Sequence, residues 1–90
     1  MRLSRVPDAA SVETRGRFEE AFGQVLRKVR LESGRSQEDV AAEAGLSTYY
    51  LRELEYGRKS ASLNAVVRLA AALGQKPHEL VRAAEVEADS

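Results

Sequence analysis

The residues that could carry out acid–base or metal chemistry are few in this sequence. His78 is the single histidine and lies beside Glu79, and cysteine is absent. The acidic runs at 19–20 and 85–89 lack the His and Cys ligands that zinc sites use. The sequence also contains no nucleophile paired with a base and no phosphate-binding glycine loop. We therefore expect a protein that is not an enzyme, without metal or cofactor, in which His78 is a surface residue.

The charged residues indicate a different kind of chemistry, the electrostatic attraction of a polyanion. The net charge is zero, with 14 basic and 14 acidic residues, which by itself argues against a nucleic-acid partner. The distribution is uneven, because residues 36–55 carry five acids and one base, whereas the flanking segments 15–35 and 56–75 are basic. This arrangement is compatible with a basic stripe on the surface.

The length and composition predict one small globular domain. The chain has 90 residues, of which 43% are hydrophobic and 31% charged. The sequence contains neither an apolar run long enough to cross a membrane nor a signal peptide, so we expect a cytoplasmic protein without a membrane partner. Ala, Leu, Glu and Arg are abundant and proline is rare, which is typical of helices.

Apolar residues recur at helical spacing through most of the chain and predict five helices and no strand. The first helix is expected from about Arg17 to Gly34 and the fifth from Pro77 to Ala84. Three serines are expected to cap the helices between them and three glycines to end them: Ser36 and Gly45, Ser47 and Gly57, Ser62 and Gly74. We expect residues 1–14 to form a flexible arm, residues 15–84 the folded domain and residues 85–90 an acidic tail.

The segment from Gln37 to Tyr56 has the pattern of two short helices joined by a tight turn. Ala41 lies where the two helices would cross, and Gly45 allows the positive φ that the turn needs. Leu51 and Leu54 would fill the space between the helices. This pattern is typical of the helix-turn-helix, whose second helix enters the major groove of DNA.

The sequence from about Phe22 to Val81 resembles the lambda-repressor/Cro-like family of helix-turn-helix proteins. The resemblance follows six blocks in order: FGQVLRKVR (22–30), SQEDVA (36–41), GLSTYYL (45–51), LEYG (54–57), SL (62–63) and LAAALG (69–74). It implies an all-α fold of five helices, binding to double-stranded DNA and homodimerisation on a palindromic operator. The short chain is also similar to the controller proteins of restriction–modification systems.

This resemblance implies two kinds of DNA contact. Family members read bases with the outward face of the second helix of the pair, which corresponds here to Ser47, Thr48, Tyr49 and Glu53. An acid such as Glu53 at a position that faces DNA lowers non-specific affinity. The phosphate contacts that the resemblance implies are Gln37, Arg27, Arg52, Arg58 and Lys59.

Three further positions each have a structural interpretation and an alternative to it. Arg30 and Glu55 match a pair that the family uses as an internal salt bridge between its first and third helices. We expect that structural pair here, the alternative being two solvated charges that contribute about 0–1 kcal/mol. For Tyr50, a place at the edge of the core and a phosphate contact are both open.

The last helix is expected to supply the contact between two copies of the chain. This helix carries more apolar residues than packing against the preceding helix needs. A two-fold contact between two copies would cover them, because it uses the same patch on both copies. The residues expected in this interface are Leu73, Leu80, Val81 and Ala84.

Taken together, these patterns predict a sequence-specific transcription regulator, a homodimeric repressor or autoregulator. Two alternatives of another class stay open. An antitoxin-type protein would bind DNA but act mainly by neutralising a protein partner, and a bridging module would have no operator of its own.

Overall fold

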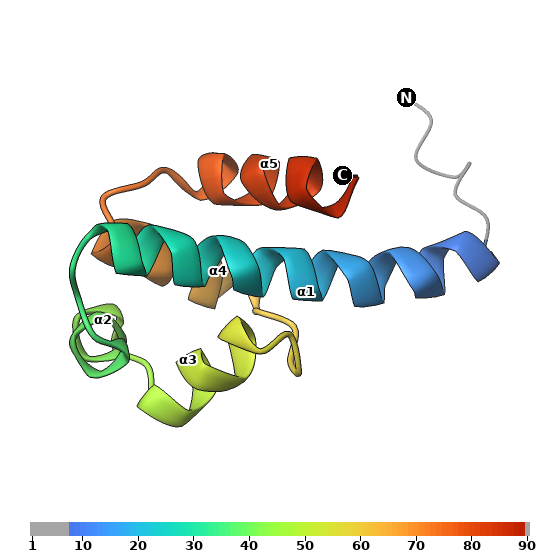
Figure 1. The fold of residues 1–90 in the computed structure, drawn as a ribbon. Helices are drawn as coiled ribbons and strands as arrows, with labels where there is room; N and C mark the ends of the chain where they lie inside the picture. The colour runs from blue at the N-terminus through green and yellow to red at the C-terminus, as the bar shows by residue number, and fades with distance from the viewer. Residues whose placement is uncertain (1–7, 90) are drawn as a thin grey trace.

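Five α-helices and no strand make up the part of the chain that is described. The computed structural model describes residues 8–89, with side chains from residue 17 onward. The helices are α1 Asp8–Glu32, α2 Gln37–Ala44, α3 Thr48–Glu55, α4 Leu63–Ala72 and α5 Pro77–Ala88 (Figure 1). Within these residues, no helix is both long and apolar enough to cross a membrane. The predicted all-α fold is confirmed.

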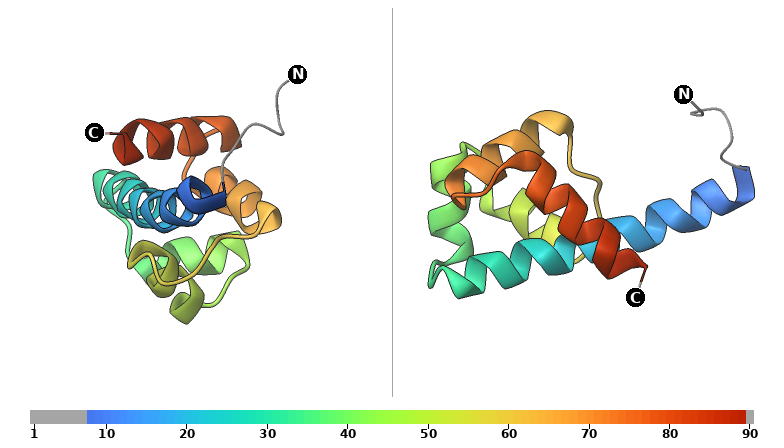
Figure 2. Two further views of the ribbon diagram at one scale, coloured as in Figure 1. Left: turned by 90° about the vertical axis from the view of Figure 1, so that its right-hand side faces the viewer. Right: turned by 90° about the horizontal axis from the view of Figure 1, so that it is seen from above.

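The helices lie in three tiers when the molecule is viewed along α1. α5 covers one side of α1, α4 lies beside α1 in the middle tier, and α2 and α3 lie on the opposite side (Figure 2). α1 contacts both α5 and α3, and α4 contacts both α2 and α5. The N-terminal turns of α1 project beyond the other helices. α3 is therefore placed against α1, and α2 is placed against α4.

Both ends of the chain are more helical than the sequence predicts. α1 begins at Asp8, so residues 8–14 of the expected arm are helical; residues 1–7 lie outside the described residues. α5 continues to Ala88, so residues 85–88 of the expected acidic tail are helical. Extending an existing helix forms one hydrogen bond for each residue fixed, whereas starting a helix is costly, and both segments extend helices that are already packed.

The predicted serine caps are present at the start of α2, α3 and α4. Each serine hydroxyl accepts a hydrogen bond, at 3.0 Å, from a backbone N–H one turn into its helix. Between α2 and α3, Gly45 has φ of 72°, and the Leu46 N–H donates to the Ala41 carbonyl at 2.9 Å. These bonds satisfy backbone groups at the helix ends and fix the turn between α2 and α3.

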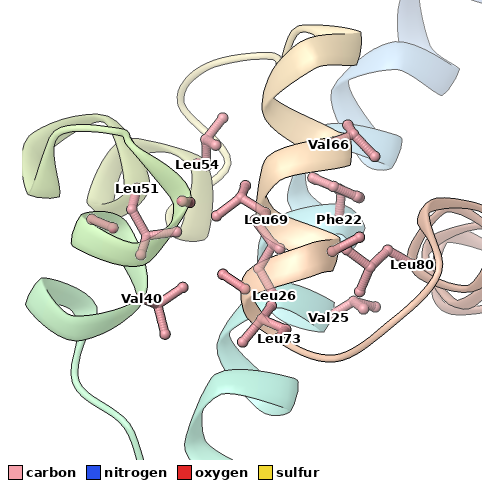
Figure 3. Packing of buried hydrophobic residues seen from close by; sticks show 14 of the residues in the cluster. Phe22, Val25, Leu26, Val40, Leu51, Leu54, Val66, Leu69, Leu73 and Leu80 are labelled. Carbon is pink, nitrogen blue, oxygen red and sulfur yellow. The ribbon is translucent and has the colours of Figure 1, made fainter.

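The core contains side chains from all five helices. Leu26, Leu51, Leu54, Leu69 and Leu80 are each at most 1% exposed. Leu51 and Leu54 of α3 lie beside Leu69 of α4 and Leu26 of α1, whereas Leu80 of α5 lies on the other side of α1 (Figure 3). Burial of α3 against α1 and α4 therefore fixes which of its faces stays outside.

Gly23 allows α1 and α3 to approach at backbone distance. A Cβ atom added at this buried position would lie 2.3 Å from the Leu54 carbonyl oxygen and 2.7 Å from that of Glu55. Glycine in the middle of a helix lowers stability by roughly 1 kcal/mol relative to alanine, so this residue has a packing reason. The last turn of α3 rests directly on α1 at this point.

We predict that Gly23→Ala destabilises the protein despite alanine's better helix propensity. The added methyl group must push two backbone carbonyls away, and overpacking of this kind costs about 1–3 kcal/mol. Urea unfolding followed by circular dichroism measures the change. Gln24→Ala, at the exposed neighbouring position, is the control and should stay within about 0.5 kcal/mol of wild type. Equal stability of the two variants would contradict the close approach.

Candidate nucleic-acid interface

A buried carboxylate, that of Glu55, joins the three helices that form the candidate DNA-binding unit. Arg30 of α1 donates from Nε to Oε2 at 2.7 Å and from Nη2 to Oε1 at 3.0 Å. Gln37, the first residue of α2, donates from Nε2 to Oε1 at 2.9 Å. Arg30 and Glu55 are each 8% exposed. The salt bridge implied by the resemblance is therefore present and holds the end of α3 against α1 and α2.

The guanidinium of Arg30 donates hydrogen bonds to acceptors that stabilise its charged form. Its Nη1 also donates to the Arg35 carbonyl at 3.0 Å. The hydrogen bond to Glu55 outweighs desolvation by burial and raises the pKa of Arg30 above its usual value. Arg30 is consequently a structural cation.

Gln37 has one side-chain N–H engaged inside the molecule. Its amide is oriented by Glu55, and the residue is partly exposed at the start of α2. The sequence predicts a phosphate contact for Gln37. That role remains a prediction. The hydrogen bond to Glu55 fixes the orientation of the amide before any ligand binds.

The outward face of α3 carries Tyr49 and Arg52. Tyr49 is 59% exposed, Thr48 is partly buried, and Arg52 is exposed one turn further along. The Ser47 hydroxyl is the N-cap and accepts from the Tyr50 N–H. Thr48, Tyr49 and Arg52 are thus carried by a short helix whose opposite face lies in the core.

Glu53 does not lie on this outward face, which corrects the expectation from the sequence. It is 9% exposed, and its Oε2 accepts a hydrogen bond from Arg58 Nη1 at 3.0 Å. The guanidinium carbon of Arg58 also lies 4.5 Å from the centroid of the Tyr56 ring. The segment that follows α3 covers this side of the helix, so Glu53 anchors that segment instead of facing DNA.

The loop between α3 and α4 folds back beside the first turn of α3. The Tyr50 hydroxyl donates to the Ser60 carbonyl at 3.4 Å and accepts from the Ser62 N–H at 3.3 Å. The Lys59 Nζ lies 5.7 Å from the centroid of the Tyr49 ring. Of the two interpretations of Tyr50, the structure supports the core edge, because its ring packs against the core.

Arg27 is the remaining predicted phosphate contact on α1, the helix on which the last turn of α3 rests. Gly23 marks the line along which α1 touches α3, and Arg27 follows it by one helical turn. Arg27 is exposed, and neither Arg27 nor Arg52 forms an ion pair within residues 17–89. Both guanidinium groups are therefore available to an anion that approaches α3.

The residues expected to join two copies are mostly buried inside one chain. Leu80 is 1%, Ala84 0% and Leu73 9% exposed, whereas Val81 is 37% exposed. The apolar face of α5 lies on α1. The periodicity of α5 shows that this face is apolar but not which helix covers it. The interface prediction is wrong for Leu73, Leu80 and Ala84, because those side chains complete the core.

Three structural residues were not identified from the sequence. Gly23 had a detectable signal, since glycine within a helical pattern often marks a close backbone approach. Tyr56 and Arg35 had none: Tyr56 stacks on Arg58, and Arg35 pairs with Glu43 and donates to the Ala72 carbonyl. These contacts depend on how the loops fold, which residue spacing does not encode.

We predict that Glu55→Ala destabilises the protein by about 3–5 kcal/mol, because it leaves the buried Arg30 charge without its partner. Thermal unfolding at neutral pH measures the loss. Glu43→Ala removes a carboxylate from the more exposed ion pair with Arg35 and serves as the control, with an expected change of about 0–1 kcal/mol. Similar melting temperatures for the two variants would show that Glu55 is not needed to hold the helices together.

Comparison with known proteins agrees with this arrangement. Residues 21–84 match the family described as helix-turn-helix domain. The control protein C.BamHI of Bacillus amyloliquefaciens is 38% identical over 61 residues, which are 67% of this chain and 75% of that protein. The crystal structure of the restriction–modification controller protein C.AhdI of Aeromonas hydrophila is similar, with a TM-score of 0.68 and 40% identity over 69% of this chain and 94% of that one. The clp gene regulator ClgR of Corynebacterium glutamicum has a TM-score of 0.76 and 30% identity over 80% and 77% of the two chains. This chain belongs to the helix-turn-helix domain family.

Proposed function

We propose that this helix-turn-helix protein is a DNA-binding transcription regulator that acts in the cytoplasm as a homodimer on a palindromic operator. The observation that carries the proposal is the short helix α3, buried on one face and fixed at its end by Glu55, with Tyr49 and Arg52 exposed on the other face. A recognition helix must be held rigidly while its side chains reach base edges in the major groove. The names of its relatives as control, controller and gene-regulator proteins support a role in regulation.

The proposed DNA contacts divide by their place around α3. Thr48 and Tyr49, with the cap residue Ser47, lie at the N-terminal end of the helix, from which base edges are read. The proposed phosphate contacts come from the second turn of α3 and from the surrounding elements, and they position the protein without reading sequence. These contacts are Gln37, Arg27, Arg52 and Arg58.

We predict that Thr48→Ala weakens operator binding by about 1–3 kcal/mol and relaxes the preference at particular base pairs. Binding to random duplex DNA should stay unchanged, because the phosphate contacts are intact. Fluorescence anisotropy with an operator selected from random duplexes, compared with unselected duplexes, measures both quantities. Ser47 is the cap of α3, so the substitution leaves the helix start intact.

Arg27→Gln is the matched comparison for a phosphate contact. It should weaken binding to operator and random DNA alike and lower the slope of log K against log salt by about one. The proposed function would be contradicted if the wild-type protein bound all duplexes equally and Thr48→Ala had no effect.

The dimer contact is proposed for α4 together with Val81 of α5. Leu63 and Val67 lie one turn apart on α4 and are 86% and 53% exposed, although the opposite face of α4 is in the core. A helix that is apolar on both faces is normally covered on both. A second copy of the chain would supply that cover through a two-fold contact.

We predict that the wild-type protein sediments as a dimer at micromolar concentration and that the double variant Leu63→Glu/Val67→Glu sediments as a monomer. Burying four carboxylates in the two-fold contact is unfavourable, whereas both positions tolerate charge in a single chain because they are exposed. Gln24→Glu/Lys28→Glu, on the exposed face of α1, should leave the dimer intact. A wild-type protein that sediments only at 9.9 kDa would rule out this interface.

A further inference from the structure

Two adjacent cations in the loop after α3, Arg58 and Lys59, lie against opposite ends of that helix. Arg58 is held at the C-terminal end by the carboxylate of Glu53 and the ring of Tyr56. Lys59 lies at the N-terminal end, with its Nζ 5.7 Å from the centroid of the Tyr49 ring. Lys59 forms no ion pair with any acid in the part of the chain with described side chains. Arg58 is thus engaged, whereas the ammonium of Lys59 is available.

The path of the loop explains why Lys59 reaches the first turn of α3. The backbone on either side of Ala61 is bound to the Tyr50 hydroxyl, through the Ser60 carbonyl and the Ser62 N–H. Because Tyr50 belongs to that first turn, the residue before Ser60 is brought beside it. Tyr49 is 59% exposed, and the cation lies at a distance from its ring at which cation–π attraction operates.

We propose that Lys59 reads a guanine in the major groove, and that Tyr49 is the positioning residue that supports its ammonium. The proposal rests on the proposed function, in which the N-terminal end of α3 faces base edges. Guanine presents two acceptors, N7 and O6, on its major-groove edge, and a lysine ammonium is a suitable donor for them. The resemblance implies a phosphate contact for Lys59. The assignment differs because the ammonium lies over the ring of Tyr49, which the proposed function places at the bases.

The first experiment compares Lys59→Met with wild type on an operator selected from random duplexes. The variant keeps the length of the side chain and removes the charge. Its affinity for the operator should fall roughly tenfold, with little change on random duplexes, and the penalty for replacing one particular G·C pair in each half-site should disappear. Lys28→Met makes the same change at an exposed position of α1 and should keep every base preference.

The second experiment tests the supporting role of Tyr49. Tyr49→Phe keeps the ring and should retain the guanine preference, whereas Tyr49→Leu should lose it at the same base pair as Lys59→Met. Adding Lys59→Met to Tyr49→Leu should cause no further loss at that base pair, because the two residues act as one unit.

Three results would overturn the proposal while leaving the regulator function in place. The first is an equal loss of affinity for operator and random DNA in Lys59→Met, which would indicate a phosphate contact. The second is a guanine preference that survives in Lys59→Met. The third is a guanine preference that survives in Tyr49→Leu. Failure of the wild-type protein to select any duplex would instead overturn the proposed function together with this inference.

Discussion

The carboxylate of Glu55 is the point on which the geometry of the DNA-binding unit depends. α3 has eight residues, too few to be a stable helix in water by itself, so its direction must be set by contacts. Glu55 supplies those contacts at the end of the helix, through Arg30 of α1 and Gln37 of α2. Because a buried ion pair pays a large desolvation penalty, its contribution is better understood as fixing how the helices meet than as net stability. Gly23 complements it by bringing the two backbones into contact.

The fold was largely predictable because its signals are local. The serine caps, the positive φ of Gly45 and the apolar stripes each depend on residues within one or two turns. The start of α1 was missed because a helix continues into sequence without an apolar pattern once a packed segment has formed. The Arg30–Glu55 pair is not local, and only the family resemblance identified it.

The candidate site was predictable in part, and the errors have one physical origin. Tyr49 is exposed as expected, but Glu53 is covered, because the loop after α3 folds back over one side of the helix. In the same way, Leu80 and Ala84 are buried because α5 lies on α1. Periodicity shows which residues share a face. It does not show which neighbouring segment covers that face.

The internal ion pairs also bear on how such a protein would find its site. Arg30 and Arg35 are each engaged by a carboxylate of the same chain, in a protein with zero net charge. Attraction to arbitrary stretches of DNA depends on cations that neutralise phosphates, and a genome offers about 10⁶–10⁹ competing sites. Few copies would be sequestered along the chromosome, and one-dimensional sliding would be brief. Occupancy of the operator would then follow the cellular concentration of the protein closely, so that a small number of molecules is enough to switch a promoter.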